Sequence, residues 1–180
     1  GVLSSGVFAT TWTVDDDGGA DFNNIQAAVD AASNGDEIVV MPGTYTSIVS
    51  EVVNMLGKEI WLHSSKGAEV TIIDGEGARL GIRCTDGENS STIIEGFTIT
   101  NGWTNSIGGG MLNYSSNPTV TDCTFENNTA NWGGGMFNEW HSSPTVTDCT
   151  FENNTSTTGG GGMYNNQNSN PTLTSCMFTG

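Results

Sequence analysis

A tandem repeat in the second half of the chain constrains the fold more than any other feature of the sequence. A twelve-residue segment begins at Pro118 and returns unchanged at Pro144, and a shorter, divergent copy begins at Pro171, so the offsets are 26 and 27 residues. The repeated segment reads Pro-Thr-Val-Thr-Asp-Cys-Thr-Phe-Glu-Asn-Asn-Thr. A second block, three glycines followed by methionine, recurs at residues 108–111, 133–136 and 160–163. Repeats of nearly constant length indicate stacked units that each contact only their neighbours.

Alternation inside the repeat indicates β-strands. The residues expected to face the interior are Val120, Cys123 and Phe125, and a bend at Asp122 accounts for the three-residue step between the first two. Helix-forming Ala, Leu and Lys are scarce after residue 85, which argues against a helical repeat. An antiparallel meander would need a hairpin signal every few residues and would not require a constant coil length. The pattern therefore predicts an all-β solenoid of parallel strands.

Stacked coils should align equivalent side chains about 4.8 Å apart. The expected ladders are Cys123/Cys149/Cys176, Phe125/Phe151/Phe178, Met111/Met136/Met163 and Asn113/Asn138/Asn165. The cysteines are close enough to form a disulfide, but side chains that point in parallel favour free, buried thiols.

The first half of the chain is expected to start the solenoid. Residues 71–75 return in similar form at 92–96, which predicts short coils near 21 residues over 12–91, followed by coils of 26–27 residues over 92–180. A helix is expected over residues 21–32, with Asp21 as N-cap and Gly35 as the stop, closing the N-terminal end. We therefore predict one solenoid domain over 12–180 after an extension over 1–11.

Two parts of the sequence resemble known families. Residues 12–80 resemble the N-terminal entry of pectate-lyase-like β-helix proteins, through the segments 14–18, 35–40, 42–45 and 73–75. Residues 108–178 resemble the repeats of polymorphic outer-membrane proteins, which pair a Gly-rich aliphatic block with Phe-x-x-Asn, as at 125–128 and 151–154. The resemblance implies a right-handed parallel β-helix of about six coils with an N-terminal capping α-helix, in a secreted, extracellular or cell-surface protein.

The net charge of the chain argues against two classes of binding partner. Four Lys or Arg residues stand against 20 Asp or Glu, for a net charge of −16, and every Lys and Arg precedes residue 84. Because no basic patch can neutralise phosphates or anionic headgroups, nucleic acid and membrane surfaces are not expected partners. The apolar runs are strand-sized, far below the roughly 20 residues of a membrane span.

Acidic side chains suggest Ca²⁺ as the one candidate cofactor. The first set of candidate ligands consists of stacked carboxylates at Asp122, Asp148, Glu126 and Glu152. Like charges one coil apart repel unless water, an amide ladder or a cation screens them. The alternative is that the glutamates are solvated and the aspartates cap their own bends. The second set is the loop with Asp15 and Asp17, for which a plain turn is the alternative.

Aromatic side chains in the loops suggest a sugar-binding surface. The candidates are Trp103, Trp132 and Trp140, which lie beside the glycine blocks. Exposed aromatic rings on a flat β-face can stack against sugars, whereas the alternative is that they pack loops onto the solenoid wall. A lyase needs a base, commonly Arg or Lys in the superfamily, and none lies in the regular coils. We therefore assign no catalytic residue.

An uncovered solenoid end suggests self-assembly. The sequence reaches Cys176 and Phe178 in mid-coil, so these side chains are expected to stack against another chain, and Phe8 in the extension is the candidate contact from a neighbour. The first-choice function is an extracellular structural or adhesive solenoid that forms homo-oligomers or filaments head to tail. The alternative is a polysaccharide-binding or calcium-dependent, polysaccharide-lyase-like domain.

Overall fold

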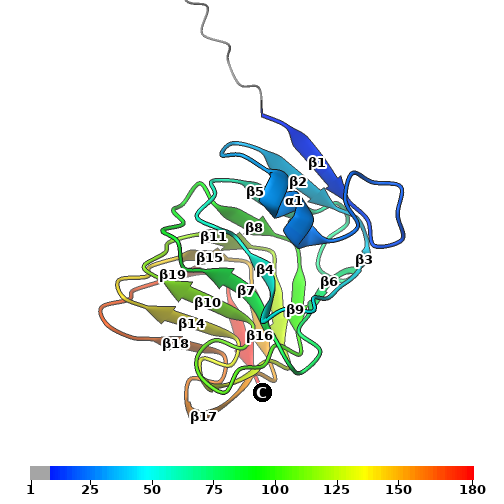
Figure 1. Cartoon of the computed structure of the whole chain (residues 1–180). Coiled ribbons are helices and arrows are strands. Elements are labelled where there is room, and N and C mark those ends of the chain that lie inside the picture. The colour runs from blue at the N-terminus through cyan, green and yellow to red at the C-terminus, as the bar shows by residue number, and fades with distance from the viewer. Residues whose placement is uncertain (1–8) are drawn as a thin grey trace, which may run out of the picture.

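In the computed structural model, which describes residues 9–180, the chain winds through three parallel sheets in turn and forms about six stacked coils (Figure 1). Sheet A contains β1 (Thr11–Val14), β2 (Glu37–Val40), β5 (Trp61–Ser64), β8 (Ile93–Glu95), β11 (Thr119–Thr121), β15 (Thr145–Thr147) and β19 (Thr172–Thr174). Sheet B contains β3 (Gly43–Tyr45), β6 (Thr71–Asp74), β9 (Thr98–Thr100), β12 (Thr124–Glu126), β16 (Thr150–Glu152) and β20 (Met177–Thr179). Sheet C contains β4 (Glu51–Asn54), β7 (Leu80–Cys84), β10 (Met111–Tyr114), β14 (Met136–Glu139) and β18 (Met163–Asn165). The predicted right-handed parallel β-helix is confirmed.

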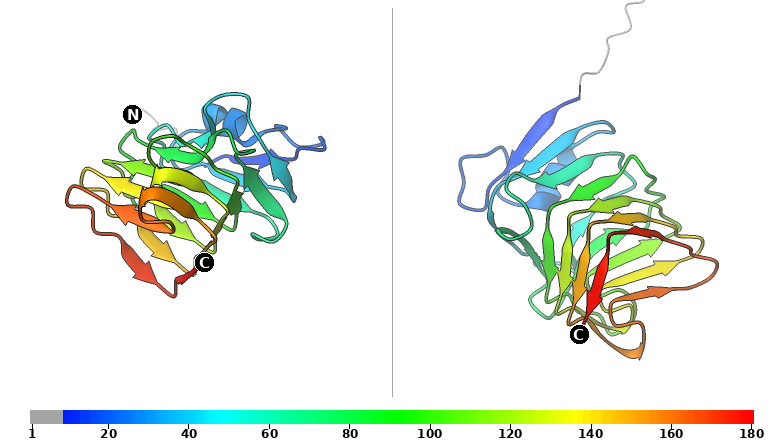
Figure 2. Two further views of the ribbon diagram at one scale, coloured as in Figure 1. Left: turned by 90° about the horizontal axis from the view of Figure 1, so that it is seen from below. Right: turned by 180° about the vertical axis from the view of Figure 1, so that it is seen from behind.

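Strand register gives the length of each coil. In sheet A, β2 to β5 and β5 to β8 are offset by 24 and 32 residues, and the following strands are offset by 26, 26 and 27. The colours follow one another in order along the stack (Figure 2, right). The expectation of 21-residue coils in the first half is wrong: residues 71–74 form β6 in sheet B, whereas 93–95 form β8 in sheet A. The two similar segments therefore belong to different walls of the solenoid.

The interior is built from the predicted ladders. Val120, Cys123 and Phe125 are at most 1% exposed, and the Asp122 bend between them has φ +52°. The Phe151 ring stacks between its two ladder neighbours, with centroids 4.8 Å from Phe125 and 4.6 Å from Phe178. All four cysteines are free, as the sequence favoured for the three on the ladder. Burial raises the pKa of the Cys84 thiol well above its ordinary value.

Amide ladders satisfy buried polar groups along the interior. Asn113 Nδ2 donates to Asn138 Oδ1 at 2.8 Å, and Asn138 Nδ2 donates to Asn165 Oδ1 at 2.7 Å. A second ladder joins Asn128 and Asn154, whose amides donate to carbonyl oxygens of the preceding coil. These side-chain hydrogen bonds connect each coil to the next, in addition to the backbone hydrogen bonds between strands.

Among residues 9–180, the helix α1 (Ile25–Ala31) covers the N-terminal end of the solenoid, and its apolar face joins the core. It is shorter than predicted, and Asn24 is its N-cap, accepting from the Ala27 amide at 2.8 Å. Asp21 instead accepts from the amide and hydroxyl of Thr13, so its assignment as N-cap is wrong.

Two further features concern the start of the solenoid. Lys58 Nζ donates to three carbonyl oxygens at the end of α1. Thr11 already belongs to β1, one residue before the predicted start of the solenoid, while Phe8 lies outside the described residues.

Within residues 9–180, no helix has the length and apolar character needed to traverse a bilayer.

Candidate functional site

The outer face of sheet C carries an apolar strip. Leu112, Phe137 and Tyr164 lie side by side in register on β10, β14 and β18. They alternate with inward-facing methionines and asparagines, so their side chains point away from the core. Leu112 and Phe137 are nevertheless buried, because loop residues cover them. Together with Leu80, Ile107 and Trp132, these side chains form a second apolar cluster on the outside of the solenoid.

Loops stacked beside sheet C supply this cover. In successive coils, the segment 103–107 lies against β13 (Thr129–Trp132), which pairs with β17 (Thr155–Gly159). The glycine block lets the chain turn from these loops into sheet C: Gly133 has φ +63°, and a Cβ on Gly110 would lie 2.5 Å from the Gly135 carbonyl oxygen. The repeated glycines thus place Ile107 and Trp132 at the edge of the apolar strip.

A pocket of about 290 Å³ opens where the loops meet the strip. Its lining consists of Ile107, Trp132, Phe137, Glu139, Tyr164 and Asn166. The Trp132 and Tyr164 rings lie 4.9 Å apart at 55°, and the Phe137 ring stacks on Tyr164 at 5.6 Å and 13°. Asn166 Nδ2 donates to Glu139 Oε1 at 3.3 Å. The pocket, called here the Trp132 pocket, thus combines flat apolar walls with one amide and one carboxylate.

The three tryptophans predicted to bind sugar lie in different places. Trp132 lines the pocket described above, whereas Trp103, 44% exposed, borders a separate hollow of about 420 Å³ beside Glu76 and Asn127. Trp140, 46% exposed, lies 6.2 Å from the ring of Tyr114. The structure therefore does not gather the three into one platform.

Of the six residues that line the pocket, the sequence analysis assigned only Trp132 to a candidate site. Phe137 and Tyr164 had a signal in the sequence, since Leu112, Phe137 and Tyr164 each follow a Gly-Gly-Gly-Met run and must share a face.

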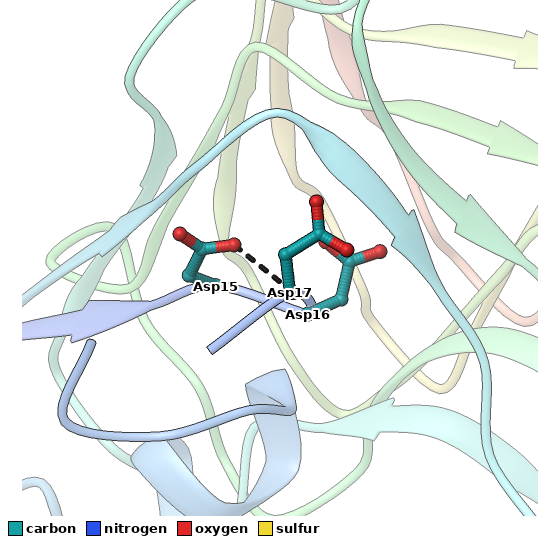
Figure 3. A group of neighbouring side chains, drawn as sticks. All are labelled: Asp15, Asp16 and Asp17. Atoms are coloured by element: carbon teal, nitrogen blue, oxygen red, sulfur yellow. Dashed lines mark hydrogen bonds between the residues drawn. The ribbon is translucent and has the colours of Figure 1, made fainter. Parts of the chain in front are cut away.

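The acidic loop before the helix brings three carboxylates together. Asp15, Asp16 and Asp17 each offer an oxygen within 4.8 Å of the others (Figure 3). Asp16 was not among the predicted ligands. Two of the carboxylates also shape the loop, because Asp15 Oδ1 accepts from the Asp17 amide at 3.1 Å and Asp16 Oδ2 accepts from the Thr44 amide at 3.0 Å. These bonds agree with the alternative of a plain turn, and calcium binding here stays a prediction.

The other predicted calcium ligands lie on the solenoid wall. Glu126 and Glu152 are register partners on the outside of sheet B, and Asp122 and Asp148 occupy the bends between sheets A and B, each with φ +52°. Within residues 9–180, only the Asp15–Asp17 loop groups three potential ligands. These positions agree with the alternative of bend and surface roles, and calcium binding at them stays a prediction.

Residues proposed for self-assembly lie on the last coil. The Phe178 side chain is 46% exposed while its ring stacks on Phe151, and Cys176 is half-buried. Their contact with another chain stays a prediction.

Comparisons with known proteins concern the scaffold. The family model described as a right handed beta helix region matches residues 19–178. Among solved structures, the chain is similar to a pectin methylesterase from carrot, with a TM-score of 0.58 and 15% identity. The match covers 98% of this chain and 65% of the carrot protein, so this chain spans less than two thirds of that protein. At this identity the likeness shows the fold alone. No curated protein matches the sequence.

Proposed function

The chain belongs to the right-handed β-helix family, and we propose that it is an extracellular polysaccharide-binding protein whose ligand occupies the Trp132 pocket. The observation that carries this proposal is the pair of rings, Trp132 and Tyr164, held 4.9 Å apart beside polar side chains at the surface. The carrot protein, whose name identifies a pectin-modifying enzyme, supports a polysaccharide ligand for a scaffold of this kind.

The pocket chemistry suits a sugar ring. A pyranose presents an apolar C–H face and a rim of hydroxyl groups, so an indole can stack on the face while amide and carboxylate groups bond the rim. Trp132 and Tyr164 supply the rings, and Glu139 and Asn166 supply an acceptor and a donor. The rings are held by Phe137 and the stacked loops, so little ordering is needed on binding.

Charge favours a neutral polysaccharide over a polyuronate. The chain carries a net charge of −16, and Glu139 adds a carboxylate inside the pocket. A polyanion would be repelled both at long range and at the pocket. Hydrolysis through paired carboxylates would require a second carboxylate facing Glu139, and the pocket lining contains only one. Binding without cleavage is therefore the function that the site supports best.

A structural or adhesive role through head-to-tail assembly is the second candidate. Met177 and Phe178 on β20 are 54% and 46% exposed, and Leu173 on β19 is 43% exposed. Exposed apolar groups beside unpaired strand edges favour addition of another strand layer. Light scattering over increasing protein concentration tests this role. A single monomeric mass at all concentrations would argue against it.

Titration calorimetry with neutral oligosaccharides of glucose, mannose and xylose tests the first proposal. Trp132→Ala and Tyr164→Ala should each weaken binding about tenfold or more, because each removes one stacking wall. Trp103→Ala is the matched control, since Trp103 is 44% exposed and borders a separate hollow. Equal losses in all three variants, or tighter binding of a polyuronate, would contradict the proposal.

A further inference from the structure

A second exposed aromatic site lies on sheet A, on a different wall from the Trp132 pocket. Trp61 and His63 are two residues apart on β5 and so lie on the same face of the strand. The strand β5 lies between β2 and β8 (Figure 1). Their rings stack with centroids 4.1 Å apart at an angle of 22°. Trp61 is 39% exposed, so loops do not cover it completely. This pair therefore forms a fixed, solvent-facing platform.

Carboxylates flank the platform on both neighbouring strands. Glu37 on β2 is the register partner of Trp61, and its Oε1 lies 2.9 Å from His63 Nε2. Glu95 on β8 is the register partner of His63, and its Oε2 accepts from Trp61 Nε1 at 2.8 Å. Thr11 Oγ1 donates to Glu37 Oε2 at 2.8 Å. The hydrogen bonds fix both carboxylates beside the rings.

No lysine or arginine forms an ion pair with either carboxylate within the part of the chain that the structure describes. The two arginines pair with Glu76 and Glu51, and Lys58 donates to carbonyl oxygens at the end of α1. The hydrogen bond from Thr11 and the contact with His63 lower the pKa of Glu37, which keeps it ionised near neutral pH. The platform thus presents negative charge beside an aromatic face, a combination that attracts cations.

We propose that this platform binds a protonated amino sugar of a polysaccharide. The indole face would stack against the sugar ring, and Glu37 and Glu95 would receive the ammonium group. A polysaccharide is favoured over a peptide because, beyond Ile93 and Glu95 on β8, the two rows of the platform continue along sheet A as outward threonines, two per strand, which offer hydroxyl partners. These are Thr119, Thr121, Thr145 and Thr147. The site is independent of the Trp132 pocket.

The test is calorimetry on the Trp132→Ala variant, which lacks the indole of the Trp132 pocket, with a glucosamine trisaccharide and its fully N-acetylated counterpart, which has the same rings without the cation. We expect one saturable site for the amine form and weaker binding of the acetylated form. Trp61→Ala should weaken binding of the amine form about tenfold, and Glu95→Gln about fivefold, since Gln keeps an acceptor for the indole but loses the charge.

Two matched controls separate this site from general attraction to an acidic protein. Trp103→Ala removes a tryptophan of similar exposure, 44%, and Glu126→Gln removes one charge from sheet B. Both should leave the affinity within about twofold. Circular dichroism of every variant checks that the fold is retained.

Three results would overturn the proposal: equal affinity for the acetylated form, equal losses in the control variants, or tighter binding of trilysine than of the amino sugar. Failure of the Trp132 proposal is recognised separately. Trp132→Ala should weaken binding of the neutral oligosaccharides and leave binding of the amino sugar at the Trp61 platform unchanged.

Discussion

Replacing Phe151 with alanine is the sharpest test of the interior ladder. Phe151 is 1% exposed and stacks nearly parallel to Phe125 and Phe178, at interplanar angles of 4° and 3°. Its removal leaves a cavity between two rings that the backbone holds in place, so the loss should fall near the usual cost of about 3–5 kcal/mol for a buried Phe→Ala change. Phe178→Ala removes the same ring from a position that is 46% exposed and has one ring neighbour, so we expect a cost of only about 1 kcal/mol.

Urea denaturation followed by circular dichroism at 25 °C measures both values. The m-value of each variant must match that of the parent chain, because local loss of a terminal coil would lower it and invalidate the comparison. A cost for Phe178→Ala equal to that for Phe151→Ala would refute the reasoning from the ladder. So would a cost below about 1.5 kcal/mol for Phe151→Ala, because an intact ring stack could not yield so little.

Three further predictions concern polar groups. Asn24→Ala should cost about 1 kcal/mol in urea unfolding, because it removes the N-cap of α1, whereas the same change at Asp21 should leave the helix intact. Asn138→Ala breaks two ladder bonds and should cost about 2–4 kcal/mol, with Asn165→Ala, at the exposed end of the ladder, costing less. Backbone amides of Ser33 and Thr10 lower the pKa of Asp36 below 3.8, so its contribution is present above that pH and lost as the pH falls through the folded-state value. The difference in Tm between the parent chain and Asp36→Asn should therefore be large at about pH 7 and shrink as the pH falls below 3.8.

Periodic features of the fold could be predicted from the sequence alone. The bend at Asp122 followed from the three-residue step between Val120 and Cys123, and the structure places Asp122 at φ +52°. Identical residues one coil apart had to stack if the strands were parallel, which produced the Phe and Asn ladders. Repetition made these predictions strong, because one local pattern was sampled in several coils.

Features that occur once could not be predicted in the same way. Asp21 matches an N-cap by residue type, but Thr13 offers it two hydrogen bonds, and only tertiary structure brings Thr13 there. The similarity between residues 71–75 and 92–96 reflects the shared chemistry of buried strands, so it could not reveal that they belong to different sheets.

The candidate site was only partly visible in the sequence. Trp132 was identified as an aromatic residue near a glycine block, but its pocket depends on how loops of unequal length pack against Phe137 and Tyr164. The Trp61 platform was missed, because its two carboxylates come from strands 24 residues before and 34 residues after the tryptophan.

The most direct test of sugar binding at the Trp132 pocket is a titration followed through the indole N–H signals in a ¹⁵N–¹H NMR spectrum. The five tryptophans give five such signals, which single-residue variants assign. A neutral oligosaccharide is predicted to shift the Trp132 signal in a saturable manner and to leave the Trp61 and Trp103 signals in place. An unchanged Trp132 signal at ligand concentrations where calorimetry shows binding would contradict the account.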